Sequence, residues 1–215
     1  MILRLSTGTI EFLKWLALPL MFGDHINLAL FDRQLPALSE MARIVFPIYA
    51  FLLAYNTARP GVDLLRVAAR LGIVAAIAQP FHVIAFPYGL LPLNVLFTFA
   101  AAVLIMWLIQ QRSLVGVLLV WAVAGVFVDY GFMGVGLALG CWFYFREPRP
   151  GRLLAPAAFL LALYLANGNL WALLAIPVIA LASVGHWRLE RHPWAFYVIY
   201  PAHLVILALV ASITA

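Results

Sequence analysis

The sequence has few charged residues and almost no cysteine, and each shortage excludes a class of protein. Asp, Glu, Lys and Arg make up 10% of the 215 residues, whereas 67% are hydrophobic. A water-soluble domain could not cover its surface with so few charges, and the mean hydropathy of +1.06 supports the same exclusion. The single cysteine, Cys141, lies in an apolar stretch, which rules out an internal disulfide and a cysteine metal site.

In place of charge, the sequence has a series of apolar runs separated by short linkers. A helix that crosses a bilayer needs about 20 mostly apolar residues. We therefore predict an all-α fold, a single membrane domain over residues 1–215 that forms a polytopic integral membrane bundle of about nine transmembrane helices. The expected spans are 10–31, 41–57, 63–84, 91–110, 113–129, 131–146, 153–167, 169–187 and 193–213.

The basic residues are divided unevenly between the two ends of these expected helices. Of the 13 Lys and Arg residues, only Arg33 and Arg43 fall at one end. The others fall at the opposite end: Arg4, Lys14, Arg59, Arg66, Arg70, Arg112, Arg146, Arg149, Arg152, Arg188 and Arg191. Because cytoplasmic loops carry an excess of Lys and Arg, we predict a cytoplasmic N-terminus and an outward C-terminus. The net charge of +5 therefore needs no nucleic-acid partner to explain it.

Polar residues inside the expected spans are the candidates for function, because such groups are costly in hydrocarbon unless they are paired or line a cavity. They gather in the half of the bundle that lies opposite the basic loops. The residues are Asp24, His25, Arg43, Gln79, His82, Asn94, Thr98, Asp129, Tyr130, Tyr200 and His203. This asymmetry predicts a polar cavity that opens outward and a separate basic rim at the cytoplasmic face.

Short motifs in the same regions occur in a fixed order along the chain. They are Leu13-Lys14-Trp15, Gly23-Asp24-His25-Ile26, Ala42-Arg43-Ile44-Val45-Phe46-Pro47-Ile48, Gln79-Pro80-Phe81, Leu93-Asn94-Val95-Leu96-Phe97-Thr98, Asp129-Tyr130-Gly131 and Tyr200-Pro201-Ala202-His203-Leu204. With these motifs the chain resembles the TraX family over about residues 12 to 206. The resemblance implies a membrane acetyltransferase that uses acetyl-CoA and acetylates the N-terminal amine of a conjugative pilin. It also implies a multi-pass protein of the bacterial inner membrane.

The polar residues suit acyl transfer from a thioester, which needs a base for the acceptor's proton and donors for the developing oxyanion. Histidine titrates near neutral pH, so we expect His25 and His203 to supply the base. Adjacent residues of a helix point in different directions, so Asp24 should not orient His25. His25 would instead need a carboxylate or amide from another helix, for which Asp129 is a candidate, and we expect Asp24 to pair with Arg43.

Contacts to the acyl donor are expected from two groups of residues. Tyr200, Asn94 and Arg43 could contact the carbonyl oxygen or oxyanion. The residues expected to bind acyl-CoA are Asn94, Thr98, Gln79, Arg59, Arg66, Arg70, Arg146 and Arg149, with these arginines at the phosphates, where Arg112 and Arg152 offer further cationic donors. Two structural interpretations stay open: the amides and Thr98 could form hydrogen bonds between helices, and the arginines could set topology. No metal site is expected, and the acceptor could be a pilin, another protein or a glycan.

Two other functions fit the same residues. Asp24, His25, Asp129 and His203 could form the relay of a proton-coupled secondary transporter. Against this, the sequence shows no pair of repeated halves, and its polar groups gather at one side instead of the midplane. The protein could also be a non-catalytic assembly partner of a secreted or pilus protein. That function would not explain why polar residues are buried in the expected spans. Acyl transfer is therefore the favoured hypothesis.

Overall fold

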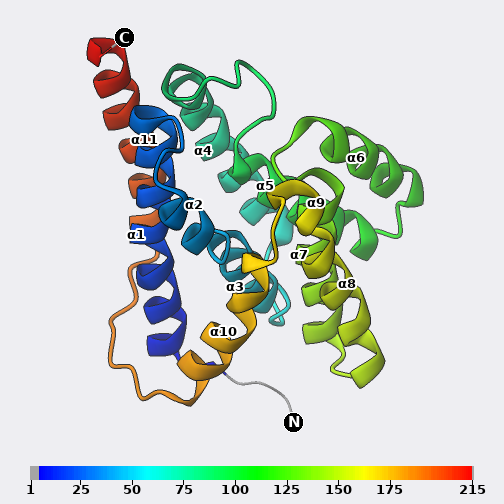
Figure 1. Ribbon diagram of the computed structural model, residues 1–215. Coiled ribbons are helices and arrows are strands. Elements are labelled where there is room, and N and C mark those ends of the chain that lie inside the picture. Colours follow the sequence, from blue (N-terminus) through cyan, green and yellow to red (C-terminus); the bar gives the residue numbers. More distant parts are fainter. Residues whose placement is uncertain (1–4, 215) are drawn as a thin grey trace.

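The computed structural model describes residues 5–214, which form a bundle of helices (Figure 1). The first half contains α1 (Thr7–Phe31), α2 (Pro36–Ala42), α3 (Val45–Thr57), α4 (Leu64–Ala85), α5 (Val95–Gln110) and α6 (Leu114–Phe127). The second half contains α7 (Gly131–Arg146), η1 (Pro150–Leu153), α8 (Leu154–Ala162), α9 (Tyr164–Asn167), η2 (Trp171–Leu174), α10 (Ala175–Val184) and α11 (Ala195–Thr214). No strand is assigned in this described range, so the predicted all-α class is confirmed.

Several of these helices have the length and composition of membrane helices. Four helical runs are long and apolar enough to cross a membrane: Pro36–Thr57, Leu64–Ala85, Pro150–Asn167 and Ala195–Ile213. Val95–Gln110, Leu114–Phe127 and Trp171–Val184 are apolar but shorter. Insertion of about nine spans and a cytoplasmic N-terminus stay predictions. Arg4, which enters the orientation argument, lies outside the described residues.

Some expected spans are interrupted where polar residues lie. The span predicted at 41–57 is divided between α2 and α3, with Arg43 and Ile44 at the break. The span predicted at 91–110 becomes helical only at Val95, because Asn94 caps the helix by accepting a hydrogen bond from the Leu96 amide at 3.1 Å. These interruptions place Arg43 and Asn94 at helix ends, where their side chains can contact neighbouring elements.

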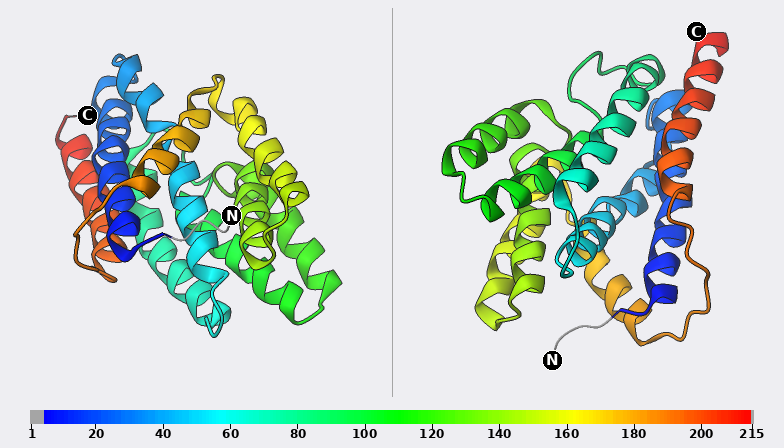
Figure 2. Two further views of the ribbon diagram at one scale, coloured as in Figure 1. Left: turned by 90° about the horizontal axis from the view of Figure 1, so that it is seen from below. Right: turned by 180° about the vertical axis from the view of Figure 1, so that it is seen from behind.

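Two hydrophobic clusters organise the bundle. One cluster joins α1, α10 and α11 to parts of α3 and α4, and the other joins α3 through α8. Figure 1 shows α1 and α11 side by side, with α6, α7 and α8 on the opposite flank, and the views in Figure 2 agree. Close packing of α7 on α8 needs Gly140, since an added Cβ there would lie 2.8 Å from the Pro156 nitrogen.

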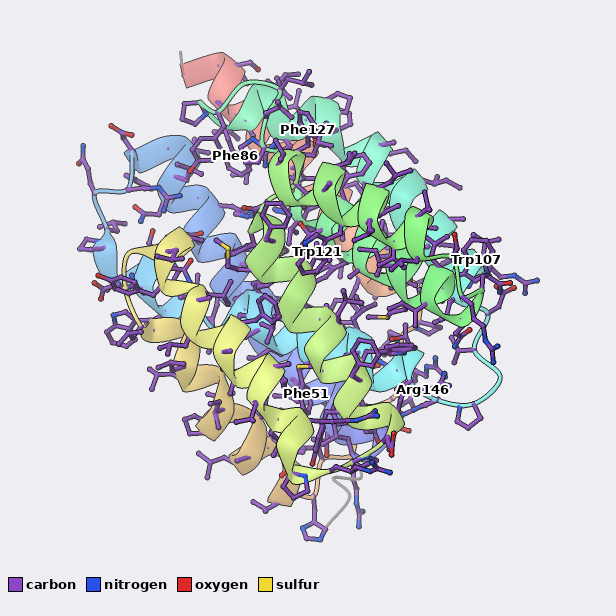
Figure 3. The ribbon with its side chains drawn as sticks, turned by 90° about the vertical axis from the view of Figure 1, so that its right-hand side faces the viewer. Phe51, Phe86, Trp107, Trp121, Phe127 and Arg146 are labelled. Carbon is purple, nitrogen blue, oxygen red and sulfur yellow. The ribbon has the colours of Figure 1, made fainter. Side chains whose placement is uncertain are left out.

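Phe86 and Arg146 lie at different levels of the bundle. Figure 3 shows Phe86 and Phe127 toward the top of the view, Arg146 in its lower part and Trp107 at its right-hand edge. The loop between α5 and α6 follows Trp107 and carries Arg112. Arg146 therefore lies away from the end that holds Phe86.

Candidate functional site

Two histidines that the sequence places 178 positions apart meet between α1 and α11. His25 Nδ1 lies 2.7 Å from His203 Nε2, and His203 Nδ1 lies 3.2 Å from the Ile199 carbonyl oxygen. A carbonyl oxygen only accepts hydrogen bonds, so His203 Nδ1 carries the proton and His203 Nε2 is the acceptor. His25 Nδ1 therefore donates to His203. In the neutral pair, this order leaves the His25 Nε2 lone pair available as a base.

Aromatic side chains surround this histidine pair. The His25 ring lies 5.0 Å from the Phe86 ring, and the His203 ring lies 5.0 Å from Phe22 and 5.2 Å from Tyr200, measured between centroids. His203 is only 8% exposed. Tyr200, predicted at the site, is thus in ring contact with His203. The apolar walls limit the water around the pair, which strengthens polar interactions inside it.

Asp24 has a different partner from the one expected. The Arg33 guanidinium, not that of Arg43, lies 3.8 Å from Asp24 Oδ1, so the predicted Asp24–Arg43 pair is wrong. Asp32 and Arg33 both have positive φ, 46° and 59°, and this left-handed turn reverses the chain after α1. Arg33 also donates a hydrogen bond of 2.7 Å to the Tyr88 hydroxyl.

The charge of Arg33 is maintained by these contacts. Partial burial opposes its charge, but the Tyr88 hydrogen bond and the Asp24 carboxylate outweigh burial and raise the pKa of the Arg33 guanidinium above its ordinary value. Asp24 Oδ1 is buried and has no hydrogen-bond donor among the residues of the described range. One acceptor next to His25 is therefore open to a bound N–H or O–H group.

Arg43 lies beside a residue that sequence reasoning missed. Its Nη1 donates to Asn167 Oδ1 at 3.5 Å, across the junction of α2, α3 and α9. Arg43 Nε and Asn167 Nδ2 are both buried and have no acceptor within residues 5–214. An amide at the end of an otherwise apolar predicted span, followed by Gly168, is the signal that could have pointed to Asn167. The two side chains offer unpartnered N–H donors to a ligand oxygen.

Asp129 belongs to the same polar region but does not orient His25. Its Oδ1 accepts a hydrogen bond of 2.9 Å from the Tyr130 amide, and its backbone carbonyl accepts one of 2.6 Å from Thr98 Oγ1. His203, and not Asp129, is the side chain that bonds His25, so the candidate role of Asp129 is wrong. The charges of Arg43 and Asp24 still act on Asp129, which places these groups in one electrostatic region.

Gln79 and Asn94 bind each other across α4 and the start of α5. Gln79 Oε1 accepts hydrogen bonds from the Asn94 amide at 2.9 Å and from Asn94 Nδ2 at 2.8 Å, while Gln79 Nε2 donates to the Leu90 carbonyl at 3.1 Å. Asn94 and Thr98 are both 0% exposed. The structural interpretation is confirmed for Gln79 and Asn94, which link α4 to the start of α5, whereas Thr98 bonds the turn between α6 and α7. Their binding to acyl-CoA stays a prediction.

The arginines predicted to bind phosphates each have a neighbour in the protein. Two approach carboxylates: Arg66 lies 3.4 Å from Asp63, and Arg149 forms an ion pair with Glu147. Three stack on rings at the following distances to the centroid: Arg59 on Tyr55 at 5.0 Å, Arg70 on Trp194 at 5.2 Å and Arg146 on Trp142 at 5.2 Å. Stacking on a ring face does not use the N–H groups of a guanidinium. The three stacked arginines can therefore still donate hydrogen bonds to an anion.

The fold and this site define a class: helical proteins with membrane-type helices that hold a histidine pair and buried charges between them. The TraX protein family model matches residues 9–211, and the chain belongs to the TraX family. Comparisons with curated proteins and with solved structures gave no significant match. Within residues 5–214, no group of three or more His, Cys, Asp and Glu residues is placed to hold a metal ion.

Proposed function

We propose that this protein is a membrane acyltransferase that moves an acetyl group from acetyl-CoA to an acceptor amine or hydroxyl at the outer face. The observation that carries the proposal is the ordered hydrogen-bond chain from His25 through His203 to the Ile199 carbonyl, which leaves one free imidazole nitrogen. Membership of the TraX family supports this reaction and favours a pilin-like N-terminal amine as acceptor. It also supports location in a bacterial inner membrane.

In the proposed reaction, His25 Nε2 takes a proton from the acceptor while the acceptor nitrogen or oxygen attacks the thioester carbonyl carbon. The carbon–sulfur bond then breaks, and the CoA thiolate takes the proton from His25 Nε2 to leave as the free thiol. During the transfer His25 is an imidazolium, and its Nδ1–H bond to His203 becomes a charge-assisted hydrogen bond. His203 thus stabilises the charged base without giving up its own proton.

The unpartnered buried atoms fit the two substrates. Arg43 Nε and Asn167 Nδ2 are donors without acceptors, as a carbonyl oxygen that develops negative charge requires. Asp24 Oδ1 accepts no hydrogen bond, since Arg33 Nη1 stays 3.8 Å away, so it could accept one from an acceptor amine or hydroxyl. The Tyr200 ring, in contact with His203, would close the apolar side of the site.

The phosphates of acetyl-CoA would lie at the opposite, predicted cytoplasmic end. Arg59, Arg70 and Arg146 are the best candidates, since their guanidinium groups stack on rings and are not in ion pairs with carboxylates. Arg66 and Arg149 would first have to leave Asp63 and Glu147. The pantetheine arm would then extend through the bundle toward His25.

The test is binding and turnover of radiolabelled acetyl-CoA by the purified full-length protein in detergent, with a peptide bearing a free N-terminus as acceptor. We expect wild type to bind the donor and acetylate the peptide, and His25→Ala to lose turnover. His186→Ala, in the exposed segment after α10, is the matched control and should keep activity. Folded wild type that does not bind acetyl-CoA would contradict the proposal and favour the proton-coupled transporter.

A further inference from the structure

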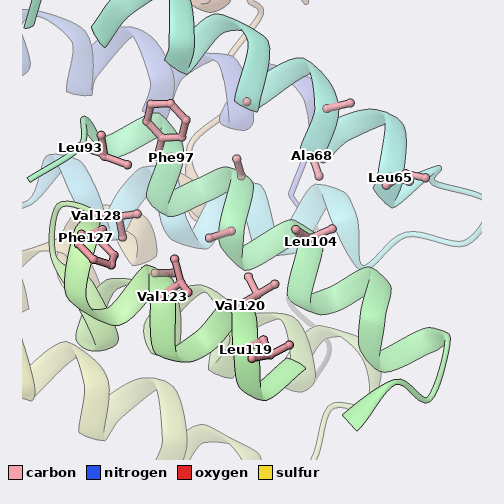
Figure 4. A pocket seen from close by; sticks show the side chains of 15 residues that line it. Leu65, Ala68, Leu93, Phe97, Leu104, Leu119, Val120, Val123, Phe127 and Val128 are labelled. Atoms are coloured by element: carbon pink, nitrogen blue, oxygen red, sulfur yellow. The ribbon is translucent and has the colours of Figure 1, made fainter. Parts of the chain in front are cut away.

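An apolar groove separates α4 from α6, with α5 as its floor (Figure 4). Its volume is about 550 Å³, which is within the range of ligand sites, and only apolar residues line it. The lining includes Leu65 and Gly72 of α4, Phe97 and Ala101 of α5, and Val123 of α6. The groove lies away from the histidine pair and takes no part in the proposed acyl transfer.

Small side chains and the placement of α6 create this space. α6 packs on α5 and α7, and Ala124 is its only residue classed as buried within the described range. A Cβ added at Gly72 would meet no heavy atom within 4 Å, so the chain leaves that part of the groove open. Water in such an apolar space would find no polar partners, which favours filling by an apolar ligand.

The surface around the groove is also apolar. Ile73 and Ile77 of α4 are 61% and 55% exposed, and Leu118 of α6 is 58% exposed. A contiguous apolar surface of this kind on a protein with membrane-type helices is expected to face lipid. An acyl chain of a bilayer lipid could therefore enter the groove from the side without crossing a polar surface.

Positive charge lies at one end of the groove. Figure 4 shows Leu65 and Leu104 at that end, with Phe127 and Val128 at the other. Arg112 is exposed in the loop that follows α5, at the end near Leu104. No carboxylate within residues 5–214 forms an ion pair with Arg112, whereas Arg66 is 3.4 Å from Asp63. An anionic headgroup would meet the uncompensated charge of Arg112.

We propose that the groove binds one acyl chain of an anionic phospholipid of the cytoplasmic leaflet, with the lipid phosphate held at Arg112. The apolar lining and flanks select the chain, and the charge at one end selects the headgroup and sets the direction in which the lipid lies.

The experiment is native mass spectrometry of the full-length protein in detergent, titrated in parallel with phosphatidylglycerol and phosphatidylcholine. We expect wild type to bind phosphatidylglycerol about fivefold more tightly, the change that one arginine near a membrane surface produces. Arg112→Gln should abolish this preference while leaving binding of phosphatidylcholine unchanged. Equal affinity of wild type for both lipids would overturn the proposal.

A second variant tests the groove itself. Gly72→Leu places a side chain in the open space and should lower binding of both lipids. Gly72→Ala controls for the gain in helix propensity, and Ala158→Leu adds similar bulk at an exposed position of α8, which does not line the groove. Both controls should bind lipid as wild type does. Undiminished binding by folded Gly72→Leu would show that lipid binds elsewhere. If that variant does not fold, Arg112→Gln alone decides between the outcomes.

Discussion

The hydrogen bond between His25 and His203 predicts which of two substitutions lowers turnover more. Removing the base, as in His25→Ala, should cost about 10² to 10⁴ in turnover, the usual contribution of general base catalysis. His203→Ala removes one hydrogen bond of 2.7 Å that becomes charge-assisted when His25 is protonated. Such bonds contribute about 1.5–3 kcal/mol, so turnover should fall by about 10- to 150-fold. The effect of His203→Ala should therefore be the smaller one.

A conservative substitution separates this role from simple packing. In His203→Gln, the amide oxygen can accept from His25 Nδ1, and the amide nitrogen can donate to the Ile199 carbonyl as His203 does at 3.2 Å. We expect His203→Gln to recover part of the lost turnover, measured with radiolabelled acetyl-CoA in single-turnover reactions. A His203→Ala loss as large as that of His25→Ala, without recovery in His203→Gln, would refute the assignment of His25 Nε2 as the base.

Three further predictions follow from contacts elsewhere in the bundle. Gln79→Leu leaves the fully buried Asn94 side chain short of a partner and should lower the free energy of unfolding by about 1–3 kcal/mol, measured by unfolding in mixed detergent; unchanged stability would contradict it. Gly140→Val pushes a side chain against the backbone of α8, 2.8 Å from the Cβ position, and should cost about 1–3 kcal/mol or prevent folding, seen as loss of monodisperse protein on gel filtration. Gln34 lies at the predicted outer end of the bundle and Arg112 at the predicted cytoplasmic end. In intact cells, a maleimide that cannot cross the membrane should therefore label Gln34→Cys and not Arg112→Cys. The reverse result would place the histidine pair on the cytoplasmic side.

The sequence alone determined the class of the fold and the candidate residues. With 67% hydrophobic residues, apolar runs long enough for membrane helices and short linkers, the sequence predicts that the backbone satisfies its hydrogen bonds within helices, and the structure is helical. Polar residues in apolar runs are costly, so they could be recognised as candidates before any contact was known. His25, His203, Asp24 and Arg43 were all found in this way.

The contacts between helices, and not the sequence pattern, show which of these residues meet. His25 pairs with His203 instead of Asp129, and Asp24 pairs with Arg33 instead of Arg43. Helical periodicity tells which residues share a face of one helix, but contacts between helices depend on how each helix is rotated and shifted against its neighbours. Close packing at small residues and breaks such as the one between α2 and α3 set those rotations, and no local pattern in the sequence encodes them.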